Sequence, residues 1–177
     1  MSLPDGWFER ITRTGLLGAA LVTTLLLSAC GFALRGSTPQ SALPFKSVYL
    51  AFPASSPLGT ELRRYVRADA RISLVSEPKL AEASIEPLAE TRNKTILSLN
   101  TQGRVREFSL FYRFTFQVKG TDNKLLLPPT EIVLRRDISF NETQAIAKEK
   151  EEEMLYRDMQ SDLVQQILRR LAAIKPI

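Results

Sequence analysis

The segment Glu107–Lys119, EFSLFYRFTFQVK, has the most regular alternation of apolar and polar residues in the chain. The odd-numbered positions are polar apart from Phe111. Successive side chains of a strand point to opposite faces of a sheet, so this pattern predicts a long strand with one buried face and one solvated face. The apolar positions are all even-numbered: Phe108, Leu110, Tyr112, Phe114, Phe116 and Val118.

The segments around this strand predict further strands. Residues 85–99 alternate less regularly, and Pro87 indicates an edge or a bulge in their early part. The sequence Asn100-Thr101-Gln102-Gly103 is typical of a turn. Alternation returns after the connection at residues 121–130. There Arg136 interrupts an apolar face formed by Ile132, Leu134, Ile138 and Phe140. Residues 47–52 predict a short first strand, and residues 71–75 are a candidate for another extended piece.

Two helices are expected from apolar spacings of three and four. The first begins at Ser56-Pro57, a capping serine followed by a proline at the first helical position. The second begins near Asn141, with Gln144 in a capping-box position, and ends before Pro176. We therefore predict an α+β fold in which two helices pack on one face of a mostly antiparallel four-stranded sheet, an α/β sandwich. The apolar repeat of the second helix is Leu155, Met159, Leu163, Ile167 and Leu171.

The N-terminus has the pattern of a lipoprotein signal. Arg10 and Arg13 precede an apolar run over residues 15–27, which is short for a membrane span. The sequence Leu27-Ser28-Ala29-Cys30 looks like a bacterial lipobox, in which the cysteine is acylated after cleavage before it. The alternatives are a plain signal peptide with a chance cysteine, or a short membrane anchor.

If the cysteine belongs to a lipobox, the chain divides into a lipoprotein signal peptide (1–29), a lipidated tether (30–45) and a single α/β domain (46–177). Gly31 follows the cysteine, where inner-membrane lipoproteins commonly have aspartate. We therefore expect a lipid anchor on Cys30 that holds the protein at the outer membrane, on its periplasmic side.

Composition argues against an enzyme. The 177 residues include no histidine and one cysteine, which removes the commonest general base, the commonest metal ligand and any internal disulfide. No glycine-rich phosphate-binding motif is present, and the acidic run at 149–153 is best explained as a solvated helix face. We expect no catalytic residues, no metal site and no cofactor other than the covalent lipid.

The formal charge of +5 favours anionic partners. Taken singly, each basic residue of the predicted hairpin, of the next strand and of the last helix is best explained as a solubilising surface charge. Arginines on the polar face of a sheet can instead bind phosphate or carboxylate groups. Nucleic acid is a poor candidate in the periplasm, so an anionic glycolipid or an outer-membrane protein is the better expectation. The residues concerned are Arg104, Arg106, Arg113, Arg135, Arg136 and Lys148.

Three segments resemble the LptE family of lipopolysaccharide-assembly lipoproteins. Residues 30–36, CGFALRG, resemble the start of the mature family members. Residues 103–110, GRVREFSL, resemble a family strand motif, and residues 145–171 are similar to the last helix of the family. The order is the same, and the match covers essentially all of the mature chain.

The resemblance implies a plug inside the β-barrel protein LptD that supports folding of the barrel and binds lipopolysaccharide during its insertion into the outer leaflet. Lys148 matches the lysine of the family's Ala-x-Ala-Lys motif. Near the hairpin turn, where the family has a basic residue, this chain has Thr101-Gln102 with Arg104 just beyond. We take Lys148, Arg104 and Arg106 as candidates for contact with lipopolysaccharide.

Two alternative functions remain open from the sequence. One is a lipoprotein accessory subunit of another outer-membrane assembly machine. The other is a periplasmic ligand-binding lipoprotein, which would be a monomer with a pocket and no stable barrel partner.

Overall fold

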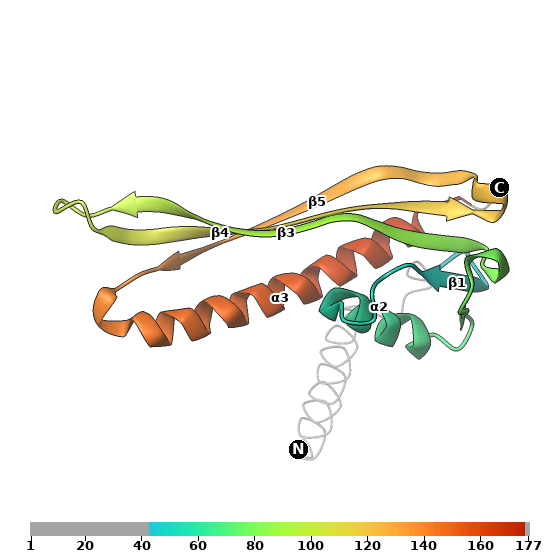
Figure 1. Cartoon of the computed structure of the whole chain (residues 1–177), viewed down its shortest axis with the longest axis horizontal. Coiled ribbons are helices and arrows are strands. Elements are labelled where there is room, and N and C mark those ends of the chain that lie inside the picture. The colour runs from blue at the N-terminus through green and yellow to red at the C-terminus, as the bar shows by residue number, and fades with distance from the viewer. Residues whose placement is uncertain (1–42, 176–177) are drawn as a thin grey trace, which may run out of the picture. The chain divides into compact units, whose positions relative to one another are not determined.

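The computed structural model describes residues 43–175 (Figure 1). The signal peptide, Cys30 and nearly all of the predicted tether lie outside these residues. The described chain runs through β1 (Ser47–Leu50), α2 (Pro57–Ala68), β2 (Ser73–Leu74), β3 (Ala83–Leu99), β4 (Val105–Gly120), β5 (Leu125–Ser139) and α3 (Ala145–Ala172). No helix in this region is both long enough and apolar enough to span a membrane.

The sheet has five strands in the order β2-β1-β3-β4-β5. β4 pairs antiparallel with β3 and with β5, while β1 pairs parallel with β2 and β3. The mostly antiparallel sheet is confirmed, but the predicted count of four strands is one too low. The additional strand, β2, lies within the candidate extended piece at residues 71–75, and its two residues are too few for an alternating pattern to count it as a strand.

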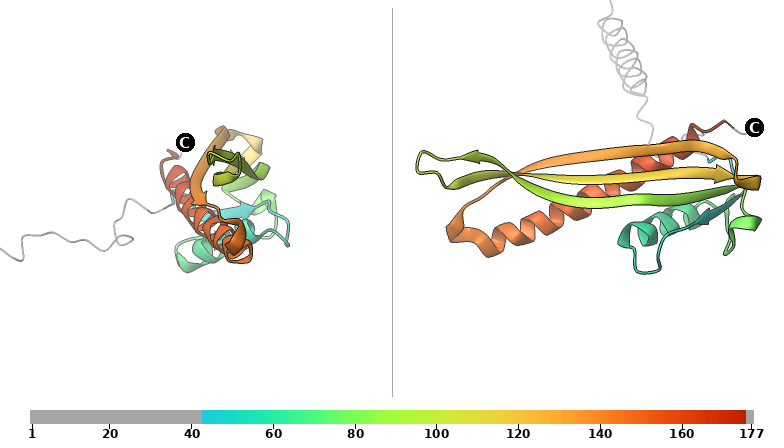
Figure 2. Two further views of the ribbon diagram at one scale, coloured as in Figure 1. Left: turned by 90° about the vertical axis from the view of Figure 1, so that its left-hand side faces the viewer. Right: turned by 45° about the horizontal axis from the view of Figure 1, so that its top comes forward.

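The core lies on the side of the sheet that both helices cover (Figures 1 and 2). Every second residue of β4 from Leu110 to Val118 is buried, as the alternation predicts. Phe114 lies at the centre, with its ring 5.9 Å from that of Phe52 and 5.6 Å from that of Phe116. α2 and α3 supply the opposing layer with buried Leu58, Leu62, Val66, Met159, Leu163, Val164, Ile167 and Leu171.

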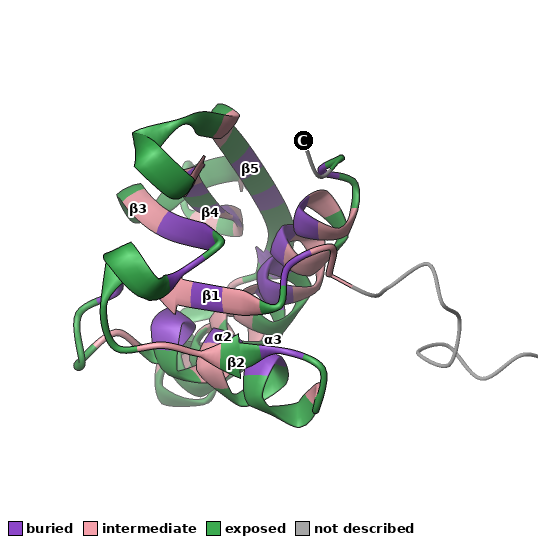
Figure 3. Cartoon of the chain, turned by 90° about the vertical axis from the view of Figure 1, so that its right-hand side faces the viewer, coloured by how far each residue is buried: buried purple, intermediate pink, exposed green. Residues whose placement is uncertain are grey.

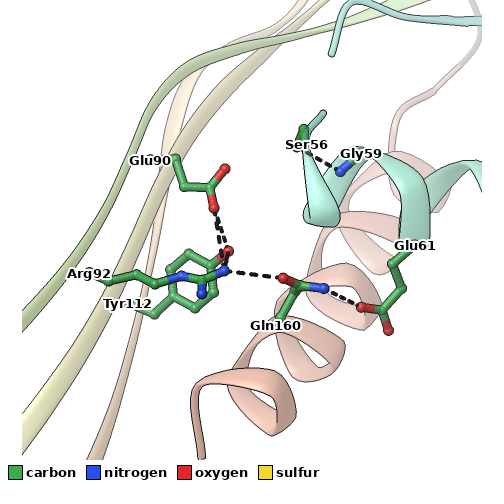
Figure 4. A network of polar contacts seen from close by, with 7 residues as sticks. All are labelled: Ser56, Gly59, Glu61, Glu90, Arg92, Tyr112 and Gln160. Atoms are coloured by element: carbon green, nitrogen blue, oxygen red, sulfur yellow. Dashed lines mark hydrogen bonds and ion pairs between the residues drawn. The ribbon is translucent and has the colours of Figure 1, made fainter. Parts of the chain in front are cut away.

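Side-chain caps begin α2 and the 3₁₀ turn that precedes α3. Ser56 Oγ accepts a hydrogen bond from Gly59 N at 3.0 Å, which confirms the predicted start of α2 (Figure 4). Asn141 Oδ1 accepts from Thr143 N at 3.1 Å, but the residues that follow form a 3₁₀ turn over Glu142–Gln144. α3 therefore begins at Ala145, one turn later than a capping box at Asn141 predicts.

The sequence irregularities have structural causes. The β3–β4 register shifts between Pro87 and Ala89, so a bulge lies where the proline predicted one. Arg136 interrupts the apolar face of β5 because its guanidinium reaches Asp162 of α3, with an N–O distance of 2.6 Å. A basic residue on this face therefore pairs with an acid of the covering helix.

A polar network ties both helices to the sheet (Figure 4). The Tyr112 hydroxyl donates to Glu90 at 2.6 Å, and Arg92 donates to the Tyr112 oxygen at 3.0 Å and to Gln160 of α3 at 3.1 Å. Gln160 donates in turn to Glu61 of α2 at 2.7 Å. Burial, together with the hydrogen bond to Glu90, raises the pKa of Tyr112 well above its ordinary value, so the phenol stays a donor.

We predict that Phe114→Ala destabilises the domain by about 3–5 kcal/mol, because a fully buried ring leaves a cavity between two stacked neighbours. The neighbouring Thr115→Ala change, on the other face of β4, should cost roughly 0.5 kcal/mol. Urea unfolding of both variants measures the difference. Equal losses of stability would show that the helix-covered face of β4 is not the core.

Candidate functional site

The candidate site lies at the end of the domain that carries the β3–β4 hairpin turn, at the left of Figure 1. The turn is built by Asn100, whose side-chain oxygen accepts from Gln102 N at 3.0 Å and from Arg104 N at 2.9 Å. Gly103 has a φ of 74°, a conformation that glycine adopts without strain. This compact turn places Arg104 directly beside the start of β4.

Arg104 reaches from the turn to the connection between β5 and α3. Its guanidinium lies 3.4 Å from the Glu142 carboxylate, and both side chains are more than 60% exposed. A solvent-exposed ion pair contributes little to the stability of the fold, so another charged group can replace either partner at a small cost in free energy. Arg104 is therefore held near the connection without being fixed there.

Arg106 contributes to the site through its main chain. Its carbonyl oxygen accepts from Phe140 N at 2.7 Å, which joins β4 to the end of β5. The side chain is exposed and forms no ion pair with any residue in the range 43–175. Arg106 is thus an accessible cation on the same part of the fold.

Lys148 lies in the first turns of α3 and faces the sheet. Its ammonium donates to Ser139 at 3.0 Å and to Glu151 at 2.8 Å, and the side chain is only 17% exposed. The helix position explains this burial, because Lys148 lies four residues before Glu152, which also faces the sheet. Lys148 is the least exposed cation of the three candidates.

Lys148 also lines a pocket of about 180 Å³ between α3 and the sheet. The lining combines apolar Phe108, Ile138 and Phe140 with the charged groups of Lys94, Lys148, Glu149 and Glu152. The rings of Phe108 and Phe140 meet edge to face with their centroids 5.2 Å apart.

A further cation, Lys94, closes one side of this pocket. Its ammonium is 2.6 Å from Glu152 and 4.4 Å from the centre of the Phe108 ring. Sequence reasoning missed Lys94, because no motif marks it and the pocket forms only when β3, β4, β5 and α3 come together. Of the missed acids, Glu151 belongs to the run at 149–153, which has the pattern of a solvated helix face, and Glu142 lies in the 3₁₀ turn before α3.

The residues of this site can bind ligands that carry both charged and apolar groups. Within residues 43–175, no three His, Cys, Asp or Glu side chains are placed to hold a metal ion. The three predicted basic residues lie at the same end of the fold, around the β5–α3 connection. Arg104 and Lys148 each have an acidic partner. The site is therefore a surface of mixed charge beside a pocket that is lined by both apolar and charged groups.

Comparison with known families identifies this fold. The model of the LptE family, described as lipopolysaccharide-assembly, matches residues 45–171. The LPS-assembly lipoprotein LptE of Yersinia enterocolitica is 28% identical over 163 residues, which cover 90% of this chain and 74% of the relative. The protein of the same name from Pectobacterium atrosepticum is 28% identical, with 91% and 85% covered.

Solved structures agree with this assignment. An uncharacterized lipoprotein B from Nitrosomonas europaea superimposes with a TM-score of 0.68 and 44% identity, covering 81% of this chain and 91% of that one. The rare lipoprotein B from Shewanella oneidensis shares the fold, with a TM-score of 0.64, 23% identity and coverage of 72% and 94%. The matched range runs from before β1 to the last turn of α3, so the chain belongs to the LptE lipopolysaccharide-assembly family.

Proposed function

We propose that this chain is a lipid-anchored, non-catalytic subunit of the lipopolysaccharide-transport machinery at the outer membrane. In this role it plugs the LptD barrel, supports assembly of the barrel and binds lipopolysaccharide on its way to the outer leaflet. The observation that carries the proposal is the family match over residues 45–171, which spans every described strand and helix. The lipobox ending at Cys30 supports placement on the periplasmic side of the outer membrane.

The open face of the sheet suits a plug. Both helices lie on one face, and the other face carries Arg113, Thr115 and Gln117 from β4 beside Glu131 and Arg135 from β5. The lumen of an outer-membrane barrel is polar, so a plug needs polar side chains toward the wall. Phe111 and the exposed Val133 are apolar exceptions on this face, so most of its side chains, but not all, match a polar wall.

Lipopolysaccharide is an amphiphile with phosphate groups and acyl chains, and the hairpin end offers groups for both. Lys148, Arg104 and Arg106 are the proposed phosphate contacts, and Phe108, Ile138 and Phe140 provide an apolar floor. Glu151 is 46% exposed in its pair with Lys148, so a phosphate can replace this carboxylate at small cost. Binding would thus exchange one charge-assisted hydrogen bond for another.

Two alternative functions make different demands on the partner. An accessory subunit of another assembly machine would associate with that machine's subunits. A ligand-binding lipoprotein would act alone, and a pocket of about 180 Å³ is small for this purpose compared with typical ligand sites of ~300–1,000 Å³.

Copurification tests the proposed partner. A tagged full chain recovered from detergent-solubilised outer membranes should bring LptD with it in a stable complex. A chain with a tag on the same terminus but with Cys30→Ala, which blocks acylation, serves as the control for membrane attachment. Recovery of subunits of a different assembly machine, or of the chain alone, would contradict the proposed function.

Charge reversal tests the proposed lipopolysaccharide contact. Lys148→Glu should weaken binding of purified lipopolysaccharide roughly tenfold, because one charge-assisted hydrogen bond is lost. Lys150→Glu is the matched control: it changes the net charge by the same amount on the same helix, but Lys150 is exposed and lies outside the pocket. Equal affinities of the two variants would remove Lys148 from the binding site.

A further inference from the structure

The positive charge of the domain is concentrated at one end. We call residues 43–87, 116–130 and 164–175 the tether end; they form β1, α2, β2, the paired ends of β3, β4 and β5 and the last turns of α3, which lie at the end that faces the viewer in Figure 3. The tether end has eleven Lys and Arg residues against six Asp and Glu residues. Residues 88–115 and 131–163 have ten against eleven, so the positive excess of the described domain comes from the tether end.

The ion pairs of the tether end neutralise this excess only in part. In the rest of the domain, cations such as Lys94 and Arg136 lie 2.6 Å from a carboxylate. On α2, Arg64 is 3.8 Å from Glu61 and 74% exposed. Arg67 is exposed and has no ion pair among residues 43–175.

Two basic side chains at this end are closely paired with a carboxylate. Lys119 is 2.8 Å from Glu86. Arg71 forms two hydrogen bonds with the carboxylate of Asp69, at 2.8 and 2.7 Å. These bonds lower the pKa of Asp69, so both partners stay charged and the pair adds no net charge. On α2, the half-buried Arg63 donates to the carbonyl oxygen of Phe52 at 2.8 Å, so the exposed positive charge of this helix comes from Arg64 and Arg67.

The solvent-facing side of α2 is a basic stripe. Arg64, Arg67 and Ala68 are exposed at spacings of three and four, opposite the buried Leu58, Leu62 and Val66. Tyr65 flanks the stripe, is 38% exposed, and has the Arg64 guanidinium 5.6 Å from its ring centre. Arginine beside a half-exposed tyrosine presents an apolar stem and a charged tip together, which suits the headgroup region of a bilayer.

The predicted anchor places this end next to a bilayer. Leu43, the first described residue, follows Cys30 by thirteen positions, and a chain of that length spans at most about 45 Å. β4, with its 16 residues, carries the hairpin end about 50 Å further along the domain. Acyl chains on Cys30 therefore remain within reach of the tether end, so the leaflet that holds them can lie against that end. A basic surface and an acyl anchor are the two signals that together give stable membrane attachment.

We propose that the exposed stripe of α2, formed by Arg64 and Arg67 with Tyr65 beside them, binds the anionic phospholipid headgroups of the leaflet that anchors Cys30. This contact rests on the acylation of Cys30, which is part of the proposed function. It gives the domain a fixed orientation, with the tether end at the level of the headgroups. The hairpin end, with Lys148 and its pocket, then points along the domain away from that contact.

Fluorescence quenching tests the contact on the acylated, mature full chain. A fluorophore is attached at Ala68→Cys in the stripe or at Ala147→Cys, an exposed position in the first turn of α3. The acylated Cys30 does not react with the label. Two kinds of vesicle are compared, and both contain a headgroup-linked quencher. One is made of phosphatidylcholine, and the other contains one part phosphatidylglycerol to two parts phosphatidylcholine.

We expect the headgroup-linked quencher to quench the label at position 68 more strongly when phosphatidylglycerol is present. The fluorescence of the label at position 147 should not change with phosphatidylglycerol. About 0.5 M KCl should reverse this quenching, because salt screens exposed charges. Arg64→Gln with Arg67→Gln should weaken the contact roughly 30-fold, since each cation near an anionic surface contributes about fivefold. Arg64→Lys with Arg67→Lys is the matched control and should retain the contact.

Five results would overturn the proposal. They are absence of quenching at position 68, equal quenching at both positions, quenching that the glutamine variant retains, quenching that salt does not reverse, and loss of quenching at position 68 when LptD is bound. The last result would mean that the barrel protein covers the stripe. A mature chain with a bare thiol at Cys30 would contradict the proposed function as well. An acylated chain that copurifies with LptD but is not quenched at position 68 would contradict the headgroup contact alone.

Discussion

Burial of one face of β4 is the constraint on which the fold depends. β4 is hydrogen-bonded on both sides, and its side chains from Leu110 to Val118 that face the helices are fully buried. Such a face needs a second layer, and α3 and α2 together with Phe52 provide it. Because side chains alternate along a strand, the residues between these buried ones form the opposite face, which is largely polar and is not covered by a helix. The asymmetry of the molecule follows directly from this alternation.

The length of the strands gives the domain two chemically different ends. At the tether end, β1, α2 and the last turns of α3 close the core, and their outer surface carries the excess of positive charge. At the hairpin end, fewer apolar groups cover the sheet, and a mixed-charge pocket forms beside Lys148. In the proposed function, the first end meets the anchoring leaflet and the second meets lipopolysaccharide. Neither role requires a group that makes or breaks a covalent bond.

Strong local patterns allowed most of the fold to be predicted. The alternation of β4, the Ser56 cap and the bulge at Pro87 each arise from a few neighbouring residues, and all three are present. β2 lies within residues 71–75, the candidate extended piece, but it was not counted in the sheet because its two residues form a strand only through pairing with β1.

The site was predicted less completely, because ion pairs join residues that are far apart in the sequence. Lys148 was identified from a short motif, whereas Lys94 lies 58 residues before its partner Glu152. Arg136 was recognised as an interruption, but only the packing of α3 on β5 shows that it pairs with Asp162. The role of Cys30 stays a prediction from its lipobox.

Photo-crosslinking in intact envelopes tests most directly whether the hairpin end is the end that meets lipopolysaccharide. A photo-reactive residue placed at position 104, in the turn, or at position 67, on α2, captures whichever molecule lies against it. Lipopolysaccharide attached to the chain from position 104 and absent from position 67 is the predicted result. Capture of lipopolysaccharide from position 67 with none from position 104 would contradict the assignment of the two ends.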